Sequence, residues 1–311
     1  MPAVTDGVYC VDKPFGITSH DVVSRLRRLL KRRDIGHAGT LDPMATGVMV
    51  VLVGEATKLS AYLTADDKAY RTRVILGSST ASLDADSPRS ELLPLDSARL
   101  AEFSSPFGQQ STPHLYAAFV AESARATQIP PAISAIHIDG VRAYERVRKG
   151  EDVAMPSREV SVRSLSYLAH GIDGDDAWIE AELHVGKGYY VRSFARDIAE
   201  HLQTVGHLNA LRRIRSGVFD VKDAHRLDAP LDELLAARIS VEAAAARCMP
   251  TLQMSEELTT RLRQGKRVAN TPPTAAPYAA ALDAAGQLIA VVGPTEGGDE
   301  LKVLRGFISQ H

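Results

Sequence analysis

The feature that most constrains the fold is a glycine-punctuated segment, residues 36–47, that separates two strongly patterned stretches. Before it, apolar residues recur at helical spacing from Ser19, which we expect to be the N-cap, to Leu30. After it, the unbroken apolar run 48–53 between two glycines is typical of a buried strand. A helix, a loop and a buried strand in this order place the loop at the edge of a core, where loops often carry function.

The rest of the chain predicts a mixed α/β fold with antiparallel character and a small β-rich module at the C-terminal end. Further strands are expected over residues 70–76, 178–185, 278–282, 288–292 and 302–304. Further helices are expected near residues 95–103, from Thr112-Pro113 onward, over 194–202 and over 236–247. The Ser-, Ala- and Pro-rich region 84–127 is expected to be peripheral, and we assign it no function.

Composition indicates an ordinary globular protein: 45% of its 311 residues are hydrophobic and 24% are charged. No apolar run approaches the length of a membrane span, and the first residues lack a secretory pattern, so we expect a cytoplasmic location. Cys10 and Cys248 are too few for a disulfide framework or a zinc site. We therefore expect two buried thiols and no metal.

The net charge excludes a positive field over the whole protein, because the chain has 36 Lys and Arg and 38 Asp and Glu, which gives a net charge of −2. Local basic clusters remain. Six of the nine residues 25–33 are basic, and Arg212, Arg213 and Arg215 form a second cluster. If the protein binds RNA, we expect placed basic patches to make the contacts.

The segment 36–47 contains two residues that could carry chemistry, His37 and Asp42. Pro43 favours an extended backbone at Asp42, so this carboxylate could be held at a loop apex. An Asp-Pro pair is also an ordinary turn device, and a loop histidine often bonds only to backbone. Taken singly, the two residues leave both interpretations open.

The whole set of short motifs is more specific than its parts. In chain order the motifs are Asp12-Lys13-Pro14, Thr18-Ser19-His20-Asp21, the 36–47 segment, Gly54-Glu55-Ala56-Thr57-Lys58, Lys68-Ala69-Tyr70, Gln128-Ile129-Pro130-Pro131, Lys187-Gly188, Arg192 and Leu211-Arg212-Arg213. Together they resemble the bacterial TruB family of tRNA pseudouridine-55 synthases over most of residues 7–220.

This resemblance implies a pseudouridine synthase fold of the α+β class, a mixed, largely antiparallel sheet flanked by helices and loops. It implies a catalytic domain over residues 1–247, with a thumb-like loop at about 128–156, and a PUA-like domain over 248–311. The implied reaction isomerises the T-loop uridine at position 55 to pseudouridine by base flipping, cleavage of the glycosidic bond and C–C bond formation. It needs no cofactor and no metal.

The resemblance also implies catalytic roles. Asp42 is the expected catalytic carboxylate, either as a nucleophile at C1′ or as the base that removes the C2′ proton. Arg192 is expected to pair with Asp42 and keep it ionised. Tyr70 is expected to stack on the target base and to help remove the C5 proton of the product.

Further residues are implied to bind substrate. Leu211 is expected to line the base pocket, and His37 to insert into the T loop where the flipped bases were stacked. Lys13 is an expected phosphate contact. Gly39 and Thr40, in the same loop as Asp42, complete the expected substrate-binding set. The expected partner is the T arm of tRNA, with no membrane, no obligatory protein partner and a monomeric state.

Some positions depart from the family pattern: His137 stands where a Lys is usual, Val185-Gly186 replaces Cys-Ser, and Tyr189 replaces Thr. Three alternatives stay open. A tRNA-binding or folding chaperone could use the same scaffold without chemistry, although it would not need Asp42, Tyr70 and Arg192 together. A carboxylate-dependent hydrolase would need a paired acid, and no second carboxylate stands out beside Asp42. An RNA-guided synthase is disfavoured because basic tails are missing.

Overall fold

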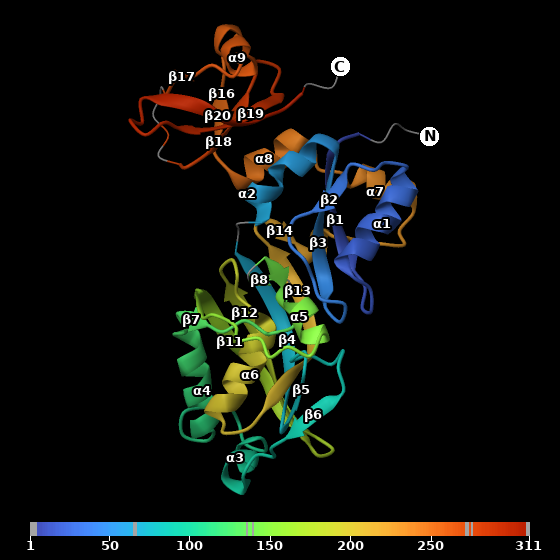
Figure 1. The fold of residues 1–311 in the computed structure, drawn as a ribbon, viewed down its shortest axis with the longest axis vertical. Coiled ribbons are helices and arrows are strands. Elements are labelled where there is room, and N and C mark those ends of the chain that lie inside the picture. The colour runs from blue at the N-terminus through green and yellow to red at the C-terminus, as the bar shows by residue number, and fades with distance from the viewer. Residues whose placement is uncertain are drawn as a thin grey trace.

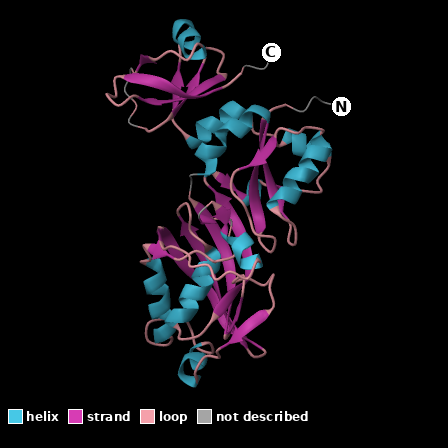
Figure 2. Ribbon diagram, viewed as in Figure 1, coloured by secondary structure: helices cyan, strands magenta, loops and turns pink. Residues whose placement is uncertain are grey.

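A computed structural model of the chain describes residues 5–64, 67–134, 136–138, 140–270, 274 and 276–308. One long sheet runs through its larger part (Figures 1 and 2). Its strand order is β11 (Val162–Asp173), β12 (Asp176–Val185), β4 (Lys68–Leu76), β13 (Gly206–Ser216), β3 (Thr46–Val53), β1 (Gly7–Lys13) and β15 (His225–Arg226). In addition β14 (Phe219–Asp220) pairs with β13, and β2 (Ile35–His37) with β3. Among the described strands of this sheet, only the β13/β3 and β1/β15 pairs are parallel, so the expected mixed, largely antiparallel sheet is confirmed.

The sheet narrows where its two halves meet. Strands β13 and β3 pair only through Arg212 with Thr46 and Arg213 with Gly47. A Cβ on Gly47, which has φ +105°, would lie 2.2 Å from the Arg213 carbonyl oxygen, so only glycine allows this approach. The junction brings the end of the 36–47 segment against β13.

Helices cover each half of the sheet around its own core. Helix α6 (Val191–His201) and α4 (Pro113–Ser123) pack on the half that contains β4 and β12, with α3 (Ser97–Glu102) beside α4. Helix α1 (Ser19–Leu30) covers the half that contains β1 and β3. Its N-cap is Thr18 rather than Ser19, because Thr18 and Asp21 form a capping box. None of the helices in the described ranges is long and apolar enough to cross a membrane.

The single helix expected over 236–247 is wrong. The structure has two helices there, α7 (Leu231–Ala236) and α8 (Val241–Cys248). Between them Ile239 exchanges two backbone hydrogen bonds with Val8, at 2.8 and 2.9 Å. This tertiary pairing extends the backbone at a position where local composition favours a helix.

A second, five-stranded sheet lies at the C-terminal end, as expected. Its order is β16 (Thr251–Gln253), β18 (Ala279–Leu282), β19 (Leu288–Pro294), β20 (Glu300–Gly306) and β17 (Val268–Ala269). Helix α9 (Glu256–Arg263), which we did not expect, packs on it.

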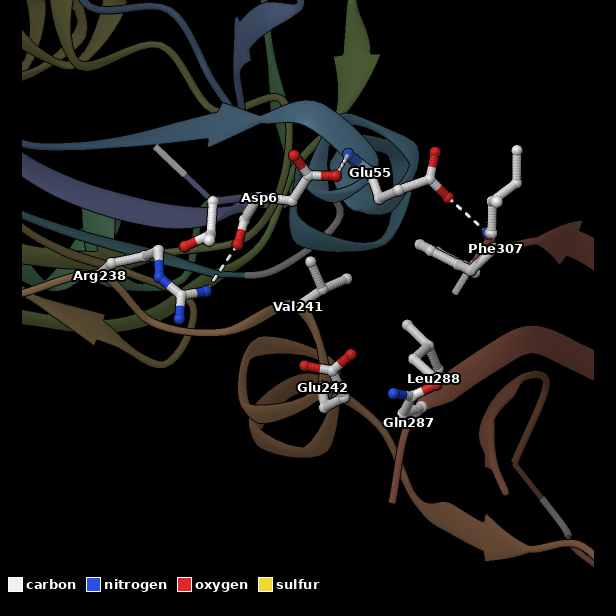
Figure 3. A pocket seen from close by; sticks show the side chains of 10 residues that line it. Asp6, Glu55, Arg238, Val241, Glu242, Gln287, Leu288 and Phe307 are labelled. Atoms are coloured by element: carbon white, nitrogen blue, oxygen red, sulfur yellow. Dashed lines mark hydrogen bonds between the residues drawn. The ribbon is translucent and has the colours of Figure 1, made fainter. Parts of the chain in front are cut away.

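The C-terminal sheet is joined to the rest of the molecule by a shared apolar cluster and a polar seam (Figure 3). The seam contains η1 (Gly54–Leu59), which continues into α2 (Ser60–Thr64). Glu55 accepts a 2.8 Å hydrogen bond from the backbone N–H of Ile308, and Lys58 donates one to the Gly306 carbonyl at 3.1 Å. These contacts hold the chain that leaves β20 against η1.

Short elements make up the segment 128–156, together with a hairpin beside it. They are β7 (Thr127–Gln128), β8 (His137–Ile138), β9 (Val141–Arg142) and α5 (Ala143–Arg148), with β10 (Arg158–Glu159) just after the segment. The hairpin is β5 (Ser78–Thr80) with β6 (Arg89–Leu92). Strands β7 and β10 pair with each other and so close the root of the segment. Residues 135 and 139 lie outside the described residues.

Candidate active site

The loop that carries Asp42 is pinned on both sides. Leu41 and Met44 are buried in the apolar core, so the loop is anchored one residue before and two residues after Asp42. The hydroxyl of Ser19, at the start of α1, accepts from the Leu41 N–H at 2.8 Å and donates to the Leu41 carbonyl at 3.1 Å. The Gly16 N–H donates to the Pro43 carbonyl at 2.9 Å. These contacts leave the Asp42 side chain projecting from a rigid loop.

Arg192, in the first turn of α6, meets Asp42 as expected. Its Nε lies 3.0 Å from Asp42 Oδ2, and its Nη2 donates to Oδ1 at 3.4 Å. The guanidinium is buried, and its Nη1 donates to the carbonyls of Ser82 and Ile133, each at 3.0 Å. The arginine is therefore held by three segments of chain before any substrate is present.

Burial raises the pKa of Asp42 above its ordinary value, and the positive charge of Arg192 opposes that shift. The side chain keeps 33% of its exposure, so it can still reach a substrate. An ionised carboxylate that has lost part of its water shell is a stronger base and nucleophile than one in bulk water. Arg192 is the main group that keeps Asp42 charged in this setting.

Two more carboxylates lie beside this pair, which corrects the expectation that none does. Asp84 Oδ2 is 3.7 Å from Arg192 Nη1, and Asp84 is buried and bonded through Oδ1 to the Ser82 hydroxyl and the Asp86 N–H. Asp86 Oδ2 accepts from the Met44 N–H at 3.3 Å. The region we took as peripheral thus supplies two acidic side chains to the site.

No local sequence pattern identifies Asp84 and Asp86 as site residues. Both follow a short hairpin strand, and the parts of the site that they contact, Arg192 and the loop that carries Asp42, are far away in the sequence. They line a cavity of about 440 Å³ with Asp42, Arg192 and Tyr144 of α5. Even so, within the described part of the chain the His, Cys, Asp and Glu side chains form no group of three that could hold a metal ion.

A second cavity, of about 420 Å³, also has Asp42 and Arg192 in its lining. It will be called the base cavity. It is lined by Gly39, Thr40, Leu41, Asp42, Thr64, Lys68, Tyr70, Ser134, Arg158, Lys187, Gly188, Tyr189, Tyr190, Val191, Arg192, Leu211 and Arg213. The structure thus brings Asp42, Tyr70, Arg192, Leu211, Gly39 and Thr40 together, although four different segments supply them.

Tyr70 and Arg213 form the floor of the base cavity. Burial raises the pKa of Tyr70, while its hydrogen bond to Arg213 acts against this. Arg213 is itself buried and donates to the carbonyls of Val48 at 2.7 Å and Gly39 at 3.2 Å. Arg213, at the centre of the expected basic cluster, is therefore not part of a surface patch, because its guanidinium supports the loop that carries Asp42 from inside.

The structure does not place Lys13 as a phosphate contact. Its side chain is fully buried, and Nζ donates to the carbonyls of Pro14, Ile17 and Pro43 at 3.1, 2.6 and 3.0 Å. Burial lowers the pKa of Lys13 to about 8. Three carbonyls use all three ammonium protons, so Lys13 holds the loop that carries Asp42 instead of facing RNA.

His37 ends β2 at the edge of the same loop and is partly exposed. Burial and the charge of Arg213 lower the pKa of His37, so the imidazole is neutral at physiological pH. A neutral, flat ring can stack on nucleobases without the cost of removing a charge from water.

The root of the segment 128–156 is tied to the helix that carries Arg192. The Gln128 side-chain amide makes two hydrogen bonds with the backbone of Tyr190, at 2.9 and 3.1 Å. The Ser193 hydroxyl donates to the Ile129 carbonyl at 2.8 Å. Because Arg192 also holds the Ile133 carbonyl, movement of the segment is expected to begin beyond Ile133.

Departures from the family pattern alter the wall of the base cavity. Tyr189 is buried in that wall. Gly186 lies in the turn beside it, where an added Cβ would come within 2.2 Å of the Ser161 hydroxyl unless that side chain rotated away. His137, where a Lys is usual, is exposed in β8.

Comparisons with known proteins agree with this geometry. A family model described as "TruB family pseudouridylate synthase (N terminal domain)" matches residues 27–191. A Corynebacterium aurimucosum protein named "tRNA pseudouridine synthase B" is 40% identical over 269 residues, which cover 85% of this chain and 85% of that protein. A Cutibacterium acnes protein of the same name is 36% identical over 299 residues, covering 96% of this chain and 97% of its own length.

The chain also resembles a solved structure titled "Structure of H/ACA RNP bound to a substrate RNA containing 2'-deoxyuridine". The TM-score is 0.68 with 20% sequence identity, and the match covers 97% of this chain and 85% of that one. At this identity the likeness shows the fold alone.

Proposed function

This chain belongs to the TruB family of pseudouridylate synthases, and from that premise we propose that it converts uridine 55, in the T loop of tRNA, to pseudouridine. The expected pseudouridine synthase fold is confirmed. The observation that carries the proposal is the ion pair of Asp42 and Arg192 at the wall of the base cavity. A binding protein without chemistry would gain nothing from a partly desolvated carboxylate in that place.

The reaction breaks the N1–C1′ bond of uridine and forms a C5–C1′ bond, after which the C5 proton is lost and N1 gains a proton. Asp42 serves either as the nucleophile at C1′ or as the base at C2′. Arg192 keeps the carboxylate ionised and oriented. Tyr70 stacks on the base and Leu211 lines its pocket, so the base stays bound while it is detached and rotates.

Access to the target requires base flipping, because a stacked uridine in a folded arm cannot reach Asp42. We assign His37 to the gap that the flipped bases leave, since its ring is neutral and partly exposed at the edge of the site. The segment 128–156 closes over the RNA, with Tyr144 and Arg148 of α5 facing the site.

The chain divides near residue 248, between a catalytic domain (1–247) and a PUA-like domain (248–311). The five-stranded C-terminal sheet with its own apolar cluster supports this division. The protein acts as a monomer without an obligatory protein partner, since one chain supplies Asp42, Tyr70, Arg192 and Leu211. Its place of action is the cytoplasm, where its tRNA substrate is found.

The test is incubation of unmodified tRNA transcript with wild-type protein or Asp42→Asn, without added cofactor, followed by carbodiimide primer-extension mapping. A single new stop at the T-loop uridine with the wild type alone is expected. Tight binding without a stop would favour the chaperone alternative. Release of free uracil, with a matching loss of RNA mass, would favour a hydrolase.

A further inference from the structure

The base cavity carries more positive charge than the proposed reaction needs. Five cations and one carboxylate line it: Lys68, Arg158, Lys187, Arg192 and Arg213 against Asp42. Uracil and ribose are uncharged, so the phosphodiester groups are the only anionic part of the substrate. The excess charge therefore indicates where a phosphate lies.

Three of the five cations are already used. Arg192 pairs with Asp42 and Asp84, and the buried Arg213 donates to backbone carbonyls and Tyr70. Lys68 is buried and donates to the Thr64 carbonyl at 3.0 Å. These groups shape the interior of the cavity, where base and ribose enter.

The other two cations, Arg158 and Lys187, are exposed at the cavity wall. Neither side chain makes a hydrogen bond or ion pair with any residue that the structure describes. They are neighbours, because the Arg158 guanidinium lies flat over Gly188, with Cζ 3.6 Å and Nε 3.7 Å from the position that a Cβ would occupy. Lys187 directly precedes that glycine.

Backbone contacts position the two segments that carry Arg158 and Lys187. The Gly186 N–H donates to the Ser161 carbonyl at 2.8 Å, which anchors the turn that presents Lys187. Arg158 belongs to β10 and pairs with Gln128 of β7, the residue that holds Tyr190 beside Arg192. Hydrogen bonds thus anchor the turn that carries Lys187, and connect the strand that carries Arg158, through Gln128 and Tyr190, to Arg192.

We propose that Arg158 and Lys187 bind a phosphodiester group directly next to the target uridine, on its 5′ or its 3′ side. The inference rests on the proposed function. A guanidinium can hold two phosphate oxygens at once, and a lysine ammonium adds a point charge beside it. With its phosphate held outside and its base inside, the nucleotide has C1′ presented to Asp42.

The test combines enzyme variants with modified RNA. A methylphosphonate removes the negative charge of one chosen phosphodiester, so synthetic T-arm stem-loops carry it either 5′ or 3′ of the target uridine. Each is assayed with the full-length wild-type protein and with the double variant Arg158→Gln/Lys187→Gln. We expect the double variant to lose roughly tenfold to a hundredfold in kcat/KM on unmodified RNA, the range for charge-assisted contacts.

At one of the two positions, the methylphosphonate should lower the kcat/KM of the wild-type protein by a similar factor. At the same position it should leave the kcat/KM of the double variant almost unchanged. If the loss caused by the double variant and the loss caused by the methylphosphonate multiply at both positions, Arg158 and Lys187 do not bind either phosphate and the proposed site is wrong. If the wild type makes no pseudouridine in the unmodified stem-loop or in tRNA, the proposed function fails instead, so the two failures are distinguishable.

Arg71→Gln is the matched control. Arg71 follows Tyr70 in β4, so strand alternation points it to the opposite face, where it pairs with Glu182 at 2.9 Å. Arg71→Gln removes one positive charge from the same sheet without touching the cavity, and any loss that it causes should multiply with the loss caused by the methylphosphonate. Unchanged thermal midpoints for both variants would show that the fold is retained, and Arg158→Lys should recover part of the loss.

Discussion

Arg192 Nε lies 3.0 Å from Asp42 Oδ2, although 150 residues separate the two in sequence. The contact joins the loop before β3 to the first turn of α6. Asp84 approaches the same guanidinium from a third segment, at 3.7 Å. Asp42, the proposed catalytic carboxylate, is therefore oriented by a network of charges whose members can be changed one at a time.

Asp42→Asn should abolish pseudouridine formation while T-arm binding stays within a few-fold of wild type. The amide keeps the size of the side chain but cannot act as nucleophile or base, so the loss falls on the transition state. Single-turnover assays and equilibrium binding measure the two effects. Binding that is lost to the same degree as activity would contradict this separation.

Arg192→Gln should lower the rate and move the acidic limb of its pH profile to higher pH. Burial already raises the pKa of Asp42, and removal of the opposing cation raises that pKa further. Because the ionised carboxylate is the active form, activity is then lost earlier as the pH falls. Single-turnover rates across the acid range measure this limb, and a limb that stays in place or moves to lower pH would refute the explanation.

Asp84→Asn should reduce kcat on the order of 10- to 100-fold with little change in KM, because a small displacement of Arg192 misplaces Asp42. Asp86→Asn is the matched control, since Asp86 lines the same cavity but is exposed and has no ion pair among the described residues. Steady-state kinetics on the two variants give the comparison. Equal effects would show that general negative charge in the cavity, not the contact with Arg192, is what counts.

Lys13→Met should destabilise the fold by roughly 2–4 kcal/mol, because it leaves three carbonyls without donors. Chemical denaturation measures the change. The salt dependence of RNA binding should stay as in wild type, since Lys13 does not face RNA. A shallower salt dependence in the variant would restore the phosphate role that the sequence suggested.

The same residue predicts a pH effect on stability. The folded-state pKa of Lys13, about 8, lies below its ordinary value of 10.5. Between these values the unfolded chain binds the additional proton, so this group adds to the free energy of unfolding as the pH rises. Lys13→Met should lack that increment. If the variant and the wild type show the same slope of unfolding free energy against pH between about pH 8 and 10, this prediction is wrong.

Local patterns in the sequence were enough for the most strongly patterned elements, whereas strands β1, β11 and β13 of the main sheet were not expected. The apolar run 48–53 and the alternating run 178–185 became β3 and β12, because period-two or unbroken apolar patterns state directly which faces are buried. The helix over 236–247 was wrong because the backbone of Ile239 pairs with Val8, a contact that no local propensity encodes. The roles of Tyr70, Leu211 and His37 stay predictions, now with a shared cavity or loop edge to test.

By itself the sequence determined the class of fold, its most strongly patterned elements and, through the family resemblance, the proposed site residues Asp42, Tyr70 and Arg192. Tertiary structure decided the environment of each side chain. It buried Lys13 and Arg213 as internal braces, brought Asp84 and Asp86 to Arg192, and left Arg158 and Lys187 exposed at the cavity wall. Residue type and spacing define which face of a strand or helix a side chain occupies, whereas its partners depend on sheet register and loop packing between segments far apart in the chain.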